Sequence, residues 1–432
     1  MAIGIFFLIF FVLMLIGAPM AVVFGGMTFL PSLINPDFSY TIETAIRSMV
    51  NGMDSFTLLA VPMFMLSGII MARGGISEKL FNFFAYFVGN KTAGLPCAVI
   101  LTCMFYAAIS GSSAATVSAV GAMTIPFLVG LGYDKIFATA IVTVAGGLGV
   151  IIPPSISYIV FSSITSASPS ALFIGGIIPG LLIGFCLMVC AYIYCKKHGE
   201  DKEKLKATYE ELHRKGFWLV FKESFFALLA PVIILGSIYG GIASPTEAAA
   251  ISVIYALVIS LFVYKTIKLK NLGTLIVEGV RTYVLVLFII SAAIAFGRVM
   301  ALLQYPQQIS QVILSNFSSK VLIILIINFI LLIFGMIMDN IPNIMVLTPI
   351  LMPVALSIGM HPVHFGIMLT ANLAIGMVTP PMGINLYVAN SMTGIPMLKI
   401  ARAAIPFLIS FLIALLFISF VPWLSLKLPG LG

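Results

Sequence analysis

The sequence has few charged residues and only one long hydrophilic stretch. Only 8% of its 432 residues are Asp, Glu, Lys or Arg, whereas 61% are hydrophobic. About 25% charged residues is usual for a soluble domain, and a core of ordinary composition cannot bury so much apolar surface. The composition therefore indicates a polytopic membrane protein, which we place in a bacterial inner membrane. It gives no support for a nucleic-acid partner.

Tryptophan, cysteine and histidine are also scarce. With only 2 Trp and with apolar segments that lack period-2 alternation, the sequence favours membrane helices over an aromatic-girdled barrel. The 5 Cys form no C-x-x-C pair, and His361 and His364 are expected in a loop, so no transition-metal site is predicted. A G-x-x-x-x-G-K-[ST] motif is absent from the sequence, as is any evident pairing of a nucleophile with a base. We therefore expect neither an enzyme nor a bound cofactor.

Two short polar clusters interrupt long apolar segments. The first, Ser110–Thr116, lies in a segment over about 95–131, and the second, Asp339–Asn343, lies in a segment over about 321–358. Each arm of about 15 residues would form a helix ~22 Å long, which is too short for a hydrocarbon core ~30 Å thick. Each segment is therefore predicted to be a re-entrant helical hairpin whose tip lies against protein or a water-filled cavity.

The two clusters belong to an internal repeat with an offset of 227 positions. The offset relates Gly149 to Gly376 and the pair Pro153-Pro154 to Pro380-Pro381. Paired halves with interrupted helices at matching positions are the strongest sequence-level indication of a transporter binding site. We therefore predict an all-α fold with two inverted structural repeats, each holding a re-entrant hairpin and a discontinuous helix.

The repeats are expected at 1–195 and 225–432. Between them lies the hydrophilic stretch 196–224, which holds 8 of the 22 Lys and Arg and is placed in the cytoplasm as a linker. Glycine and proline should break a helix within about 136–165 in the first repeat and within about 365–392 in the second, because they favour unusual backbone angles and remove a hydrogen-bond donor.

Each half is predicted to place a polar hairpin tip against its broken helix. Helix N-termini suit carboxylates, whereas hydroxyls and freed carbonyls suit sodium, so we infer a site for an anion and sodium where the halves meet. The predicted cation-binding residues are Ser110, Gly111, Ser112, Ser113, Gly149, Pro153, Asp339, Asn340, Gly376, Thr379 and Pro380. The predicted substrate-binding residues are Ser113, Thr116, Arg298 and Asn343.

Several of these residues have a second interpretation. Ser112, Ser113, Asp339 and Asn340 could cap helices, which is compatible with a site at a hairpin tip. Arg298 could extend its guanidinium to the membrane surface instead of binding substrate. Glu247 could couple an ion, but its spacing from Ser244 is typical of a capping box.

Four motifs give the chain a resemblance to a known family over essentially its whole length. It resembles the large membrane subunit of tripartite ATP-independent periplasmic (TRAP) transporters. The motifs are Gly111-Ser112-Ser113-Ala114-Ala115-Thr116, Gly149-Val150-Ile151-Ile152-Pro153-Pro154-Ser155, Ala243-Ser244-Pro245-Thr246-Glu247-Ala248 and Gly376-Met377-Val378-Thr379-Pro380-Pro381. The resemblance implies an elevator-type fold of the ion-transporter superfamily and sodium-driven uptake of an organic acid, such as a C4-dicarboxylate, a sialic acid or another sugar acid.

The resemblance also implies two protein partners. These are a periplasmic substrate-binding protein and a small membrane subunit of four helices, which we expect to be a separate chain. The hairpin tips resemble the Ser-Asn-Thr tips of sodium symporters for divalent anions, but here they read Ser112-Ser113-Ala114 and Asp339-Asn340-Ile341. The alternatives are a stand-alone sodium/dicarboxylate symporter and, from another class, a channel or a membrane scaffold. A scaffold would not need paired polar interruptions at one offset.

Overall fold

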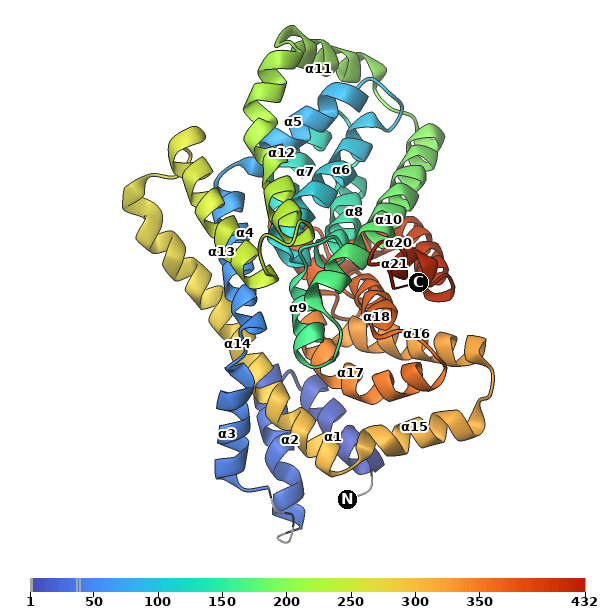
Figure 1. Cartoon of the computed structure of the whole chain (residues 1–432). Helices are drawn as coiled ribbons and strands as arrows, with labels where there is room; N and C mark the ends of the chain where they lie inside the picture. Colours follow the sequence, from blue (N-terminus) through green and yellow to red (C-terminus); the bar gives the residue numbers. More distant parts are fainter. Residues whose placement is uncertain (1–2, 36–37, 39, 432) are drawn as a thin grey trace.

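The computed structural model describes residues 3–35, 38 and 40–431, and the regular structure of these residues is entirely helical (Figure 1). The first half contains α1 (Ile3–Leu15), α2 (Met20–Ile34), α3 (Ile42–Met53), α4 (Ala60–Arg73), α5 (Ile76–Val88), α6 (Gly94–Ser110), α7 (Ser113–Gly130), α8 (Lys135–Ala145), α9 (Ile156–Ser163) and α10 (Pro169–His198). The second half contains α12 (Phe217–Tyr239), α13 (Pro245–Val258), α14 (Leu272–Leu302), α15 (Tyr305–Asn316), α16 (Lys320–Ile337), α17 (Asn340–Ser357), α18 (Pro362–Gly376), α19 (Ile384–Thr393), α20 (Met397–Phe420) and α21 (Trp423–Leu426). Between the halves lies α11 (Lys202–Arg214).

The helices repeat with the offset found in the sequence. Both ends of α7 and α17 are 227 positions apart, and α6 and α9 match α16 and α19 to within one residue at their first positions. Each repeat thus runs through a hairpin, a helix that breaks at glycine, a short helix and a long helix. The Pro153-Pro154 and Pro380-Pro381 bonds are both cis. The predicted all-α fold of two inverted repeats with hairpins and discontinuous helices is confirmed.

One pair of equivalent segments differs between the halves. In the first half α3 and the segment Thr57–Arg73 meet at a bend of 69°, whereas in the second half α14 is one continuous helix of 31 residues. At about 1.5 Å per residue α14 is ~46 Å long, enough to cross a membrane at a tilt. It packs against α2, α3, α4 and α17, so it connects the N-terminal helices to the second hairpin.

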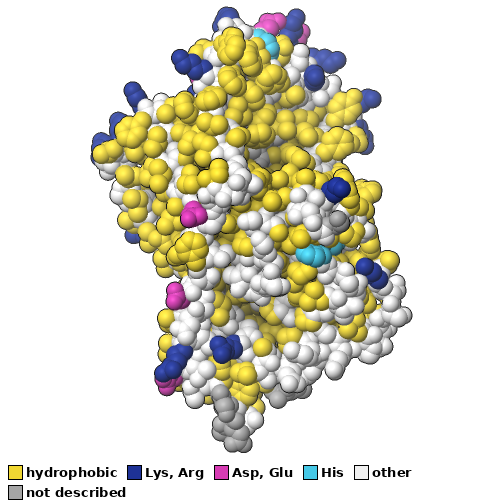
Figure 2. Space-filling view, viewed as in Figure 1, with side chains coloured by type: hydrophobic (Ala, Val, Ile, Leu, Met, Phe, Trp, Pro, Cys, Tyr) yellow, Lys and Arg dark blue, Asp and Glu magenta, His cyan; other side chains and the backbone are white. Residues whose placement is uncertain are grey.

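The surface has the distribution expected in a membrane. Within the described ranges, eight helices are long and apolar enough to cross a bilayer, or nine if the bent pair counts as one span. Figure 2 shows hydrophobic side chains over most of one face, with Lys and Arg gathered toward the end that carries α11. The chain is therefore a multi-pass membrane protein.

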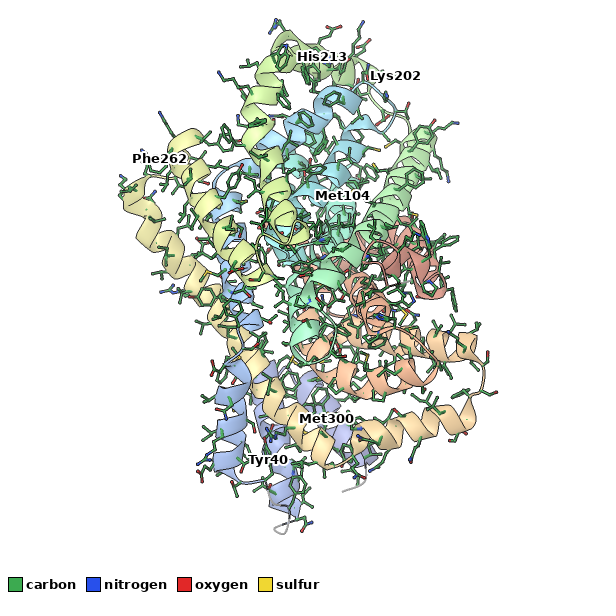
Figure 3. All side chains as sticks on the ribbon, in the orientation of Figure 1. Tyr40, Met104, Lys202, His213, Phe262 and Met300 are labelled. Carbon is green, nitrogen blue, oxygen red and sulfur yellow. The ribbon has the colours of Figure 1, made fainter. Side chains whose placement is uncertain are left out.

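The linker is shorter than the sequence predicted. Phe217 to Ser224 belong to α12, because the apolar run begins at Phe217 in spite of the charged pair Lys222 and Glu223. Most of the remaining linker forms α11, which Lys202 and His213 mark in Figure 3. The His213 ring stacks on Tyr86 of α5 with centroids 3.9 Å apart, so α11 is held against the first repeat.

Two further expectations concern helix starts. α18 begins at Pro362 rather than near 365, so His364 lies inside a helix and is buried, not in a loop. This is because His361 caps α18 and Pro362 fits its first turn. Ser244 and Glu247 form the capping box at the start of α13, with the Ser244 N–H donating to Glu247 Oε2 at 2.7 Å. Helix capping therefore explains why Glu247 stands at this position, without a role in ion coupling.

Candidate functional site: the cavity between the two hairpin tips

The tips of both hairpins line one cavity of about 200 Å³. The first hairpin, α6 and α7, lies near α5 in Figure 1, and the second hairpin, α16 and α17, lies near α15. Their tips meet at the cavity. The cavity is lined by Met65, Gly111, Ser112, Ser113, Ala114, Val150, Ile156, Ser157, Thr282, Val286, Asp339, Asn340, Ile341, Met377 and Ile384. Residues of both repeats and of α14 therefore share this space.

The first tip is a tight turn closed by hydroxyl groups. Gly111 has a φ of +60°, which glycine adopts without strain, and Ser112 caps α7 through its side chain. The Ser110 and Thr116 hydroxyl oxygens lie 3.0 Å apart, and Thr116 Oγ1 donates to the Ser112 carbonyl at 2.8 Å. These bonds fix the bend between α6 and α7 and direct the N-terminus of α7 toward the cavity.

The first tip packs directly on the broken helix of its own repeat. A Cβ added to Gly149 would lie 2.4 Å from the Ser112 carbonyl oxygen and 2.7 Å from Thr116 Oγ1. The Ile156 N–H, which follows the proline pair, donates to the Gly111 carbonyl at 3.3 Å. Glycine is thus required at position 149 by close approach, and the hairpin tip and the break form one unit.

The second tip is closed by carboxylate and amide groups instead. Asp339 caps α17, with its Oδ1 accepting from the Asn340 N–H at 2.7 Å. The Asn343 Nδ2 donates to the carbonyls of Met338 at 3.0 Å and Phe334 at 3.2 Å, which closes the end of α16. The Oδ1 atoms of Asn340 and Asn343 are buried and have no hydrogen-bond partner in the described part of the chain.

The second hairpin also approaches its broken helix closely. A Cβ on Gly376 would lie 2.3 Å from the backbone of Gly335 in α16. Beyond the proline pair, the Met382 N–H donates to the Met336 carbonyl at 3.1 Å. The Thr379 hydroxyl donates to the Ile375 carbonyl at 2.8 Å, within its own helix end. As in the first repeat, a glycine contact joins the hairpin to the break.

Two pairs of side chains connect the hairpin tips to the other repeat beside the cavity. The Ser113 hydroxyl donates to Asn385 Oδ1 at 2.9 Å, and Asn340 Nδ2 donates to the Ser157 hydroxyl. Ser113 and Asn340 are the first residues of α7 and α17, while Ser157 and Asn385 are the second residues of α9 and α19. Each tip is therefore bonded to the helix that resumes after the break in the other repeat.

The cavity gathers some of the sequence-predicted residues and not others. Five of them line it: Gly111, Ser112, Ser113, Asp339 and Asn340. Ser110, Thr116, Gly149, Asn343 and Gly376 are buried behind the tips, Pro153 is buried, and Thr379 and Pro380 are half-buried at the second break. Arg298 is exposed on α14 and is not among the lining residues.

Sequence reasoning missed two polar residues that line the cavity, Ser157 and Thr282, and one beside it, Asn385. Ser157 and Asn385 supply the bonds between repeats, and Thr282 contributes from α14. A signal for the first two was present, since each polar residue follows a proline pair at the start of a resumed helix. Thr282 had no signal, because nothing in the sequence directs this part of α14 toward the hairpin tips.

The cavity combines two kinds of polar group. The N-termini of α7 and α17 both meet it, so the positive ends of two helix dipoles favour an anion there. The buried Oδ1 of Asn340, which has no donor in the described part of the chain, and the carboxylate of Asp339 favour a hard cation, which binds oxygen. Asp339 is the one charged side chain among the described lining residues.

Comparisons with known proteins agree with this architecture. A family model described as "Tripartite ATP-independent periplasmic transporter, DctM component" matches residues 7–424. The chain is 39% identical over 407 residues to the C4-dicarboxylate TRAP transporter large permease protein DctM of Pseudomonas aeruginosa, covering 94% of this chain and 92% of that protein. It is 35% identical over 419 residues to the sialic acid TRAP transporter large permease protein SiaM of Vibrio cholerae, covering 95% and 97%.

Two further similarities extend the comparison. The chain is 39% identical over 421 residues to the isethionate TRAP transporter permease protein DctMQ of Oleidesulfovibrio alaskensis, which covers 98% of this chain but 65% of that longer protein. Among solved structures, the Alcanivorax borkumensis YdaH transporter superposes with a TM-score of 0.63 at 14% identity, covering 97% of this chain and 99% of that one. At this low identity, the similarity shows that the two chains share a fold.

Proposed function

Because this chain belongs to the DctM component family of tripartite ATP-independent periplasmic transporters, we propose that it is a large permease through which a small organic acid enters the cell together with sodium. The observation that carries the proposal is the convergence of two hairpin tips on one cavity, where each tip is bonded to the broken helix of the other repeat. A cavity between broken helices is where secondary transporters hold substrate and coupling ions.

The proposed substrate position lies at the N-termini of α7 and α17. Ser113 and Asn340 begin these helices, and a carboxylate between them would meet two positive helix ends. Thr116 and Asn343 lie behind the tips and would hold them in shape, while Arg298 is exposed on α14 and would act only through attraction over a distance. The substrates named for the relatives, C4-dicarboxylate, sialic acid and isethionate, are all organic anions.

The proposed sodium positions lie where each tip meets its broken helix. In the first repeat the Ser112 carbonyl and the hydroxyls of Ser110 and Thr116 lie at the contact with Gly149, and Pro153 follows in the break. Ser113 is the next residue of the tip after Ser112. In the second repeat the buried Oδ1 of Asn340 and the carboxylate of Asp339 lie near the break at Gly376, Thr379 and Pro380. These oxygens fit a hard cation, because two of the amide oxygens in this tip lack a donor.

The transport movement is proposed to be of the elevator type. Within each repeat a glycine contact joins hairpin to broken helix, and the bonds Ser113–Asn385 and Asn340–Ser157 join the repeats. The hairpins and broken helices would therefore move as one body past the long helix α14 and the N-terminal helices. We also propose that a periplasmic binding protein delivers the substrate.

A small membrane subunit of four helices is the second proposed partner. The DctMQ relative is longer than this chain, which spans 65% of its length. The remainder of that protein leaves room for a further membrane module, so the same partnership is proposed here between this permease and a small subunit. The proposed location is a bacterial inner membrane.

Uptake into proteoliposomes tests the proposal. The vesicles would contain this chain and the small subunit, with the binding protein and a labelled organic acid outside and a sodium gradient imposed. Uptake that requires both sodium and the binding protein supports the proposal. Sodium-dependent uptake that ignores the binding protein would favour a stand-alone symporter, and flux that is indifferent to sodium would contradict the sodium positions.

A further inference from the structure

Each hairpin also has a pocket at its base, which is the end of its second helix opposite the tip. A pocket of about 520 Å³ lies at the turn between α7 and α8, and one of about 360 Å³ lies at the turn between α17 and α18. Their lining residues correspond at the offset of 227 positions. The matched pairs are Gly132 with Gly359, Tyr133 with Met360, Asp134 with His361, Phe137 with His364, Cys195 with Pro422 and Gly199 with Leu426.

The first pocket is acidic, and the chain itself satisfies its carboxylates. Glu200 accepts hydrogen bonds from the Tyr133 hydroxyl and from the Ala93 N–H, the latter at 2.9 Å. Asp134 Oδ1 accepts from the Phe137 N–H at 2.8 Å, and Asp201 pairs with Lys204 at 3.6 Å. A carboxylate of the linker therefore ties the base of the first hairpin to the end of α10.

The second pocket has the opposite charge and no such carboxylate among its described lining residues, which include Lys320, His361 and His364. Lys427 stands 227 positions after Glu200, so a basic residue replaces the acidic one. Figure 2 shows histidine beside Lys or Arg side chains, without an acidic side chain between them, over the region of α16 and α18. The second base thus lacks the counter-charge that the first base contains.

In the second pocket the hydrogen bonds of the described residues leave donors on His361 and Lys320, whereas His364, whose Nε2–H donates to a carbonyl, contributes none. His361 Nδ1 accepts from the Val363 N–H at 3.2 Å, which places the proton of the neutral ring on Nε2. Lys320 is the first residue of α16, so the pocket also includes a helix N-terminus, where the positive end of the helix dipole favours an anion. His364 is 1% exposed, its Nε2 lies 3.3 Å from the Ser419 carbonyl, and its Nδ1 has no partner in the described ranges.

We propose that this second pocket is a binding site for the carboxylate of a small organic anion, which takes the place that Glu200 occupies in the first pocket. Lys320 and the Nε2–H of His361 supply the charge-assisted hydrogen bonds, and the helix N-terminus adds to them. The volume of about 360 Å³ admits a small acid. The site is separate from the central cavity, so it does not depend on the proposed transport activity.

Histidine NMR on the full-length chain tests this site. The chain has 4 His, so a protein labelled with ¹³C at histidine Cε1 gives few signals, each assignable with a His→Gln variant. Succinate is the probe, with inorganic phosphate as a second anion, in nanodiscs of neutral lipid, and nanodiscs that contain anionic lipid form a separate arm. The expected result is a saturable shift of the His361 and His364 signals with succinate, while the signals of His198 and His213 stay in place.

Two variants separate this site from the central cavity. Lys320→Gln, at an exposed position, should weaken the succinate response about tenfold or more, which corresponds to about 1.4 kcal/mol. Asn340→Ala alters the central cavity and should leave the response unchanged. The proposal is overturned if succinate causes no saturable shift, if Lys320→Gln responds like the unaltered chain, or if the signals respond only to anionic lipid in the nanodisc.

Discussion

Ser113 and Asn385 are 272 positions apart in the chain, yet their side chains are in direct contact. The Ser113 hydroxyl lies 2.9 Å from Asn385 Oδ1 and 2.7 Å from Asn385 Nδ2, and Nδ2 also donates to the Thr143 carbonyl at 3.2 Å. All three residues are buried. The first hairpin tip is thus attached to the second repeat by a polar contact that water does not reach.

Removal of the Ser113 hydroxyl should impair transport. In Ser113→Ala the buried Oδ1 of Asn385 loses its donor, which costs about 1–3 kcal/mol. We expect the initial rate of organic-acid uptake to fall about tenfold or more, with a lower melting temperature. Ser118→Ala, at an exposed position of the same helix, is the matched control and should behave like the unaltered chain. Equal uptake by both variants would show that the contact has no role.

The second bond between repeats should behave as a coupled pair. Asn340→Ala and Ser157→Ala each break the same contact, so the double variant should lose little more than the worse single variant. The loss in free energy of unfolding of the double variant should differ from the sum of the two single losses by about 0.5–3 kcal/mol. Thermal unfolding of the four proteins in detergent measures it, and Asn340→Ala combined with Ser118→Ala serves as an additive control. Additive losses for Asn340 and Ser157 would mean that they act independently.

Close packing at the break should make Gly149 intolerant of a methyl group. In Gly149→Ala the new Cβ would meet the Ser112 carbonyl oxygen at 2.4 Å, so the tip must shift. We expect loss of uptake and a drop in melting temperature of several degrees. Gly130→Ala adds the same methyl group near the end of α7, where nothing lies within 4 Å, and should be neutral or slightly stabilising. A functional Gly149→Ala protein would disprove the required close approach.

Asp339→Asn separates charge from capping at the second tip. Asparagine retains an oxygen that can accept from the Asn340 N–H, so the start of α17 and the melting temperature should be preserved. If the carboxylate binds sodium, its neutralisation should raise the sodium concentration for half-maximal uptake about tenfold, or about 1.4 kcal/mol. Uptake measured over a sodium series at fixed ionic strength decides this. An unchanged half-maximal concentration would restrict Asp339 to a capping role.

The contact at the first hairpin base should stabilise the chain over a defined pH range. Burial, followed by the hydrogen bond to Glu200, raises the pKa of the Tyr133 hydroxyl well above its usual range. A raised pKa in the folded state means that this stabilisation is fully present below the unfolded pKa of about 10 and is lost as the pH rises further. Tyr133→Phe should therefore lower the melting temperature by the same amount at pH 6 and pH 9. If the loss of melting temperature in Tyr133→Phe became smaller between pH 6 and pH 9, the raised pKa of Tyr133 would be contradicted.

The repeat, the hairpins and the breaks could be predicted from the sequence because turn-forming residues recur at a fixed offset. Glycine and proline act locally, so the glycines at Gly146–Gly149 and Gly376 and the two proline pairs indicate where the helices break. The start of α12 at Phe217 was misplaced because two charged residues, Lys222 and Glu223, lie within its first two turns, where Glu223 pairs with Lys79 of α5 at 3.1 Å. The position of His364 was missed for a related reason, since its helix begins earlier than the apolar pattern suggests.

Partners across the repeats could not be predicted in the same way. The Ser113–Asn385 and Asn340–Ser157 bonds depend on how two halves pack, and no local pattern in either half encodes the orientation of the other. The exposed position of Arg298 likewise follows from the rotation of α14, which its packing against α2, α3 and α4 determines. Its predicted role in substrate binding stays a prediction.

The most direct test of the shared cavity uses two equivalent positions. Ala114 and Ile341 are 227 positions apart and line the same cavity, one at each hairpin tip. Ala114→Cys and Ile341→Cys would be made separately in an active chain whose five cysteines are replaced, and reaction with a small thiol reagent would be timed. Our account predicts that sodium and the transported organic acid together slow labelling at both positions. Protection at one tip, with unchanged labelling at the other, would contradict a single site formed by both hairpins.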